Sequence, residues 1–310
     1  MGLRAMRKRQ LLLVAALAAA GLGLLGDGRA NAAPRPALPP QGIYEYCAPL
    51  KGPHRCLARL RRIAEGGFRV VVNYEQLHST RAQLLTYART AKRLGVKIVW
   101  PLKEGVWWAP GGDPVRAHPA LAVGCRCRER AALIRWFVRL VRDLLATWGY
   151  YVGDETDPAA APEVGAFTSE IRRLDPRHPR LFIAQGENPQ RDLAPFGPVA
   201  DMIGVDWYPV GLNLPLSSVR TVNQEAARIS RAHGRSRAAV LQAFSWAQYS
   251  HPAATAARWP SRHEMRRMRD LALRAARPRL LLWYSYFDIQ RSRYRAARWR
   301  ALRWAAFGRR

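Results

Sequence analysis

The sequence repeats one pattern eight times between Gly42 and Asp288: a short apolar run ends in polar or aromatic residues, and a longer stretch with helical periodicity follows. The apolar runs are rich in Val, Ile, Leu or aromatic residues and are too short for helices; they cover residues 42–46, 68–73, 96–101, 149–153, 180–184, 202–206, 239–242 and 279–284. Such alternation favours a parallel sheet, and eight units in about 250 residues are typical of one α/β domain with the (β/α)8 TIM barrel fold. An open doubly wound sheet is the alternative, although eight units are many for it.

Four segments show the helical pattern most clearly, with apolar residues three and four apart and arginines on the other face. They are residues 81–94, 130–146, 162–174 and 261–276. The expected fifth helix, residues 190–199, is short and is interrupted by Pro195 and Pro198. The sequence contains no internal repeat beyond the strand–helix unit, so we expect a single domain over residues 42–310.

The first forty residues do not follow this pattern. Basic residues 4, 7, 8 and 9 precede an apolar stretch over residues 11–25, and Ala30-Asn31-Ala32 offers small residues to a signal peptidase. We therefore expect a secretory signal peptide over residues 1–32, a Pro-rich lead-in over 33–41, and a secreted or cell-surface protein without a transmembrane segment in the mature chain. An uncleaved membrane anchor is the alternative, but the apolar stretch is shorter than the roughly 20 residues that span a bilayer.

Export would give the four cysteines a role, because disulfides persist in oxidising compartments. Cys47 and Cys56 follow the first expected strand, and Cys125 and Cys127 follow the third, so all four belong to loops at the same end of the barrel. Pairing within Cys125-Arg126-Cys127 would strain the chain, so two bridges between these loops are expected, with Cys47–Cys56 as the competing arrangement. A zinc site is the other alternative; its ligand spacing would be unusual, and no metal is expected.

The formal net charge of +29 is extreme, and 46 of the 51 basic residues are arginines distributed over most of the expected helices. A solvated outer ring explains this distribution. The functional alternative is a basic surface that holds the protein near an anionic polymer such as an acidic polysaccharide or cell-wall phosphate. No zinc finger, basic zipper or RNA-binding aromatic signature is present, so nucleic acid is not an expected partner. Residues 291–310 combine aromatic residues with arginines and could lie on a membrane surface, but are expected to form the last barrel helix.

The ends of the expected strands carry carboxylates, amides and aromatic rings. In TIM barrels the active site is built at the carboxyl ends of the strands, and sugars pack on aromatic planes while their hydroxyls bond to carboxylates and amides. We therefore predict a site for an oligo- or polysaccharide. Its predicted binding residues are Tyr44, Asn73, Trp100, Glu104, Asp154, Tyr208, Gln242, Trp246, Trp283 and Tyr284.

Four short motifs at these strand ends carry a resemblance. They are Gly-Tyr-Tyr-Val-Gly-Asp-Glu at 149–155, Ile-Gly-Val-Asp-Trp-Tyr-Pro at 203–209, Leu-Gln-Ala-Phe at 241–244 and Leu-Trp-Tyr-Ser-Tyr at 282–286, with Trp259, Pro260 and Glu264 between the last two. Over about residues 42–288 the chain resembles the barrel-type glycoside hydrolase superfamily, nearest to its poorly characterised cellulase-like branches. The resemblance implies that Glu155 is the general acid/base. It also implies a nucleophilic glutamate at the end of the seventh strand, where this chain has Gln242, which cannot form a glycosyl ester.

Glycoside hydrolysis usually needs a carboxylic acid and a second carboxylate, about 5 Å apart for retention and up to about 9 Å for inversion. Neighbouring residues on a strand face opposite ways, so Asp154 is not expected to partner Glu155 unless the strand has ended. Asp206 is the predicted second catalytic carboxylate. The carboxylates ranked behind it are Glu104, Glu45 and Asp288.

Four residues are expected to complete the subsite. Tyr208 and Gln242 would hold substrate hydroxyls or a catalytic water, and Trp283 and Tyr284 would form the floor. Two functions stay open: a secreted glycosidase, and a carbohydrate-binding barrel without hydrolytic activity, which Gln242 favours. The sequence has no nucleophile elbow, phosphate-binding loop, dinucleotide motif or zinc-protease motif, so no cofactor is expected.

Overall fold

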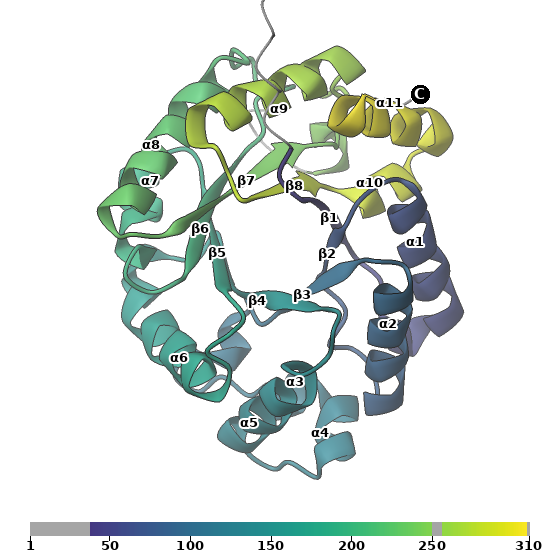
Figure 1. Cartoon of the computed structure of the whole chain (residues 1–310), viewed down its shortest axis with the longest axis vertical. Coiled ribbons are helices and arrows are strands. Elements are labelled where there is room, and N and C mark those ends of the chain that lie inside the picture. Colours follow the sequence, from purple (N-terminus) through teal and green to yellow (C-terminus); the bar gives the residue numbers. More distant parts are fainter. Residues whose placement is uncertain (1–37, 250–255, 309–310) are drawn as a thin grey trace, which may run out of the picture. The chain divides into compact units, whose positions relative to one another are not determined.

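Eight parallel strands close into a barrel in sequence order, with β1 paired to both β2 and β8 (Figure 1). This computed structural model describes residues 38–249 and 256–308, so the expected signal peptide and most of the Pro-rich lead-in lie outside the described residues. The strands are β1 (Gln41–Glu45), β2 (Val70–Asn73), β3 (Lys97–Pro101), β4 (Thr147–Asp154), β5 (Arg180–Gln185), β6 (Met202–Trp207), β7 (Ser236–Gln242) and β8 (Leu280–Tyr284). The closed barrel confirms the predicted TIM fold and excludes the open sheet.

The strands are buried on both faces, which explains why they are nearly continuous apolar runs. Tyr44, Val72 and Val99 are aligned across β1, β2 and β3 and belong to the cluster inside the barrel. Val71, between two inward residues, belongs instead to the layer between strands and helices. The barrel is therefore filled by alternate residues of each strand, and the next residue of each strand packs on the outer helices.

The helices form a ring around the barrel (Figure 1). They are α1 (Pro53–Glu65), α2 (Arg81–Arg93), α3 (Pro114–Ala117), α4 (Pro119–Cys125), α5 (Arg130–Val141), α6 (Ala161–Leu174), α7 (Pro189–Asp192), α8 (Ser218–Ala232), α9 (Arg262–Ala276), α10 (Tyr286–Arg291) and α11 (Arg295–Phe307). Capping boxes at Thr80 and Ser261 start α2 and α9. The weak fifth segment forms only the short α7 and a 3-10 turn, Ala194–Phe196, because its two prolines interrupt a helix.

The last helix, α11, packs on the barrel. Trp299 and Phe307 lie 5.4 Å and 5.1 Å from the ring of Phe68, and Leu302 is fully buried. Its apolar residues are thus used in packing, as expected of a barrel helix. Within residues 38–249 and 256–308, no helix has the length and apolar character needed to cross a membrane.

Gln41 ties the two ends of the barrel chain together. Its side-chain amide donates to the carbonyl of Ala306 at 2.8 Å, and its carbonyl oxygen accepts from the indole N–H of Trp283 at 2.9 Å. The first strand, the last strand and the last helix therefore share one hydrogen-bonded junction.

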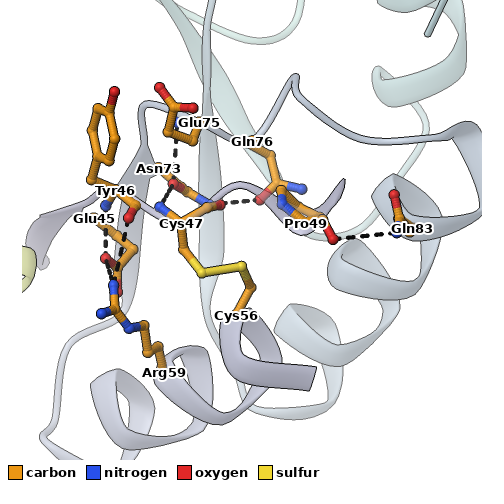
Figure 2. Close-up of a disulfide and its surroundings, with 10 residues drawn as sticks. All are labelled: Glu45, Tyr46, Cys47, Pro49, Cys56, Arg59, Asn73, Glu75, Gln76 and Gln83. Atoms are coloured by element: carbon orange, nitrogen blue, oxygen red, sulfur yellow. Dashed lines mark hydrogen bonds and ion pairs between the residues drawn. A yellow bond between two sulfur atoms is a disulfide. The ribbon is translucent and has the colours of Figure 1, made fainter. Parts of the chain in front are cut away.

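The disulfides join neighbours in sequence. Cys47 pairs with Cys56 at the start of α1, and Cys125 pairs with Cys127 (Figure 2 shows the first pair). The expected bridges between the first and third loops are therefore wrong, and the competing Cys47–Cys56 arrangement is present. The reason for the second pair is a left-handed turn at Arg126, with φ of 57°, which brings the two Cα atoms to 5.2 Å.

Candidate active site

A pocket of about 270 Å³ opens at the carboxyl ends of the strands. Its lining comes from the ends of β2, β4, β5, β6 and β8 and from the segments that follow β6 and β7. The lining residues are Tyr74, Asp154, Glu155, Gln185, Asp206, Trp207, Tyr208, Leu212, Phe244, Trp246, Tyr249 and Tyr284. Ligands of TIM barrels bind at this end, so the pocket is the candidate active site.

Glu155 enters the pocket because β4 ends one residue before it. Its φ is 48°, in the left-handed region that non-glycine residues rarely adopt, and its backbone N–H donates to the carbonyl of Ile183 on β5 at 2.9 Å. The alternation of the strand is broken at that point, so adjacent Asp154 and Glu155 both line the pocket. Because β4 has ended before Glu155, Asp154 and Glu155 can act on the same ligand.

The carboxyl groups of Glu155 and Asp206 are hydrogen-bonded to each other, and Tyr208 donates its hydroxyl to Asp206 at 3.1 Å. Burial, followed by the charge of Glu155, raises the pKa of Asp206 well above its usual range. Partial burial also raises the pKa of Glu155, which is exposed at the pocket mouth. Two carboxyl groups can hydrogen-bond to each other only when one of them carries a proton, and the raised pKa of Asp206 favours that state.

Asp154 has a different environment. Its two oxygens accept from the hydroxyls of Tyr151 at 2.5 Å and Tyr74 at 2.8 Å, and the ammonium of Lys103 lies 3.2 Å away. Lys103 also lies 4.2 Å over the ring of Tyr74. These donors fix Asp154 as an oriented acceptor beside the carboxyl pair.

Aromatic rings from the segments after β6 and β7 and from the end of β8 form one wall of the pocket. Tyr208 contacts Phe244 and Tyr284 with ring centroids 5.0 Å and 5.7 Å apart, and Trp246 donates its indole N–H to the carbonyl of Tyr208 at 3.1 Å. Tyr249 closes this wall and donates its hydroxyl to the buried Asp288 at 2.7 Å. Such rings offer flat faces to the C–H surfaces of a sugar.

Five residues of the predicted site line the pocket together with the predicted acid: Asp154, Asp206, Tyr208, Trp246 and Tyr284 join Glu155. Tyr44 lies beneath them instead. It is buried, and its ring packs against those of Tyr74 and Tyr284 at 5.3 Å each. Glu104 is exposed after β3 and is outside the pocket lining.

The two tryptophans predicted at strand ends are corrections. Trp100 and Trp283 are fully buried in the layer between strands and helices. Trp100 packs on Phe137 of α5 and donates to the hydroxyl of Thr147, while Trp283 donates to Gln41. Both face outward from the barrel because of strand alternation, so neither can contact a ligand in the pocket.

Asn73 and Gln242 are also corrections, since both amides are buried and hold backbone. Asn73 accepts from the N–H of Cys47 at 2.9 Å and donates to its carbonyl at 2.8 Å (Figure 2). Gln242 makes the same pair of bonds to Val210, each at 2.9 Å. These side chains position the loops after β1 and β6 rather than a substrate.

The pocket uses several residues that the sequence prediction did not select: Tyr74, Gln185, Trp207, Leu212, Phe244 and Tyr249. Three of them, Tyr74, Gln185 and Trp207, directly follow or end a strand, and Phe244 is the second residue after β7, so their position was the available signal. Leu212 and Tyr249 come from irregular segments farther on, for which strand ends give no signal. Within the described part of the chain, no group of three His, Cys, Asp or Glu side chains is placed to hold a metal ion.

Comparison with known proteins finds structures with a similar fold but no related sequence family. No family model matches the chain, and no curated protein sequence matches it. Among solved structures, it is similar to an endo-1,4-beta-D-mannanase from Thermotoga petrophila RKU-1, with a TM-score of 0.57 and 13% identity over 80% of this chain and 88% of that one.

Two further structures agree. A putative alpha-L-fucosidase from Bacteroides thetaiotaomicron has a TM-score of 0.61 and 10% identity over 87% of this chain and 96% of that chain. A GH2 beta-galacturonidase from Eisenbergiella tayi has a TM-score of 0.56 and 13% identity, and the match covers 88% of this chain and 51% of that longer one. The chain therefore has the barrel fold of glycoside hydrolases. At these identities the likeness establishes the fold alone.

Proposed function

We propose that this protein is a secreted glycoside hydrolase that acts on a polysaccharide or a cell-envelope glycan, with Glu155 as general acid/base. The observation that carries the proposal is the hydrogen-bonded pair of Glu155 and Asp206 in a pocket lined with aromatic rings. The signal peptide predicted from residues 1–32 supports the export part of the proposal.

The two carboxyl groups have complementary positions. Asp206 is buried and its pKa is raised the more strongly, so it keeps a proton in the pair; Glu155 stands at the mouth, where a glycosidic oxygen can reach it. Asp206 passes the shared proton to Glu155, and Glu155 transfers it to the leaving oxygen. Asp154, Tyr208, Trp246 and Tyr284 contact the sugar in this proposal.

A non-catalytic carbohydrate-binding barrel is the second candidate, and Gln242 favours it. The position at which related barrels have a nucleophilic glutamate is filled by an amide that is fully engaged with the backbone of Val210. Such a protein would keep the aromatic wall and the polar groups that bind a sugar without breaking a bond.

The test is release of reducing ends from a panel of plant, fungal and bacterial-envelope polysaccharides by the chain from about Ala33 onward. We expect turnover that falls by at least about 10²–10⁴-fold in Glu155→Gln, the usual loss when a general acid is removed. Glu104→Gln is the matched control, since Glu104 is an exposed glutamate outside the pocket. Equal activity of Glu155→Gln and the parent would refute Glu155 as the acid; binding by both without turnover would support the second candidate.

A further inference from the structure

The carboxyl groups that line the pocket all lie on one side of it. They belong to Asp154 and Glu155 at the end of β4 and to Asp206 on β6, whereas the wall from β8 and the segment after β7 supplies Phe244, Trp246, Tyr249 and Tyr284. Residues 250–255, which the structure does not describe, include no Asp or Glu. An enzymatic nucleophile or base must face the acid across the sugar, at about 5 Å or more. Asp206 is in direct contact with Glu155, so it cannot take that place.

The polar groups in and beside this wall are poor nucleophiles. Burial raises the pKa of Tyr208 well above its ordinary value, and it raises the pKa of Tyr249 and Tyr284 as well, so their phenols are neutral at physiological pH. Gln242 is buried, with its side chain hydrogen-bonded to Val210. The described lining residues therefore offer an acid, but no group that would attack the anomeric carbon from the opposite face.

The role of Glu155 as acid does not account for the position of Asp154 in the pocket. It is adjacent to Glu155, and three donors from Tyr74, Tyr151 and Lys103 hold its carboxylate in place. A fixed carboxylate beside a proton donor is suited to accept a hydrogen bond from an N–H group of the substrate. A sugar with an amide at C2 places such an N–H one carbon away from the reacting centre.

We propose that the substrate is a glycan of 2-acetamido sugars and that the acetamido carbonyl is itself the nucleophile, with Asp154 holding the amide N–H. This inference rests on the proposed function and names its substrate class. Glu155 gives a proton to the glycosidic oxygen as the bond from that oxygen to C1 breaks, and the carbonyl oxygen bonds to C1 to form a cyclic oxazolinium. Water then adds to C1, the ring opens, and the proton lost by the water returns to Glu155.

The charge of the pocket agrees with a neutral sugar. None of the described lining residues is Lys or Arg, and the nearby Lys103 is paired with Asp154. The carboxylate of a uronic acid would therefore meet three acidic side chains without a cationic partner, which is unfavourable. An acetamido group has no net charge and supplies one donor and one acceptor.

The test uses fluorogenic 4-methylumbelliferyl glycosides and short oligosaccharides in matched pairs that differ only at C2, acetamido against hydroxyl, in both anomers and in the gluco and galacto series. We expect at least a 100-fold preference for the acetamido member. On that substrate, replacing acetamido by trifluoroacetamido should lower kcat at least tenfold, because fluorine withdraws electrons from the attacking carbonyl. Asp154→Asn should lower kcat on the acetamido sugar by a similar or larger factor. A stable thiazoline analogue of the oxazolinium should bind more tightly than the parent sugar.

The outcomes separate the two proposals. Glu155-dependent hydrolysis of the hydroxyl members at equal or higher rates, or indifference to trifluoroacetylation, would overturn the acetamido nucleophile and leave the glycosidase. Absence of turnover on every pair, and on the polysaccharides above, would reject both the glycosidase and this inference. The affinity for the thiazoline is measured independently of turnover. A thiazoline that binds no better than the parent sugar contradicts the inference.

Discussion

At the scale of single residues, Glu155 has the least common conformation in the pocket. A left-handed φ in a residue with a long side chain costs about 1–3 kcal/mol and persists only where the surroundings impose it. Here the hydrogen bond to Ile183 of β5 helps to impose it, and the gain is an acid that shares the pocket with its sequence neighbour Asp154. No local sequence rule signals such a break in a strand.

The charge of Lys103 should set the upper pH limit of activity. The pKa of Glu155 is raised by burial and lowered by Lys103, so removing this cation raises it further. The acid form then survives to higher pH, and the alkaline limb of the kcat–pH profile of Lys103→Met should move upward. Lys97→Met is the control, because Lys97 lies at the opposite end of β3 and its ammonium group donates to the carbonyl of Leu145. A downward shift would contradict the assignment.

His118 should make stability depend on pH. It is almost fully buried, stacks on Trp107 at 5.2 Å, and neither ring nitrogen has a hydrogen-bond partner. Burial lowers its pKa to about 4. Because the unfolded chain binds the proton at a pKa of about 6.5, the free energy of unfolding should fall as pH drops from about 6.5 to 4, by up to roughly 3 kcal/mol. Urea unfolding of His118→Phe should show a flatter pH dependence; an identical slope would exclude His118 as the cause.

At the scale of elements, the pattern of the sequence predicts all eight strands, because each is a buried apolar run between helical segments. It does not predict which face a residue takes where both faces are apolar. Trp283 lies between Leu282 and Tyr284, so alternation alone cannot decide which aromatic residue faces the pocket. The structure places Tyr284 there and Trp283 against Gln41.

The pocket residues were predictable to a similar degree. Asp154, Glu155, Asp206 and Tyr208 follow from strand ends and from the resemblance. Tyr249 depends on the path of a segment beyond β7, and the buried roles of Asn73 and Gln242 depend on backbone groups of other loops. Such contacts arise from tertiary structure, about which a single sequence contains little information.

The Cys47–Cys56 bridge should contribute to stability. It closes a loop with a sequence separation of nine, for which chain entropy predicts about 2–3 kcal/mol. Replacing both cysteines by serine should lower the Tm by about 5–10 °C for a domain of this size, measured by calorimetry. The comparison variant is Cys125→Ser with Cys127→Ser, whose shorter loop predicts a smaller loss. The reverse order of the two losses would contradict this account.

At the scale of the whole molecule, the chain separates its charges. The net charge is +29, yet no described residue of the pocket lining is basic. We propose that the exterior holds the protein near an anionic polymer of its surroundings, while the pocket takes the glycan. Attraction between exposed charges is screened within about 10 Å at 0.1 M salt.

This separation predicts salt-sensitive retention that is independent of the site. The protein should bind immobilised polyphosphate at low salt and elute as NaCl rises through a few hundred millimolar, because the Debye length contracts. Glu155→Gln should elute at nearly the same salt as the parent. Failure to bind at low salt would argue for arginines that only solvate the helices, and saccharide competition would place the polymer in the pocket.

The junction at Gln41 bears on whether the chain tolerates circular permutation. Because Gln41 bonds to Ala306, the first and last elements of the barrel meet in space. Folds with adjacent ends tolerate circular permutation at exposed turns. A short linker from the end of α11 to residue 38, with new ends opened at Gly111 in the turn before α3, should give a permuted barrel with an unchanged pocket. The order in which the ribosome makes the eight strand–helix units could then be changed without changing the residues of the pocket.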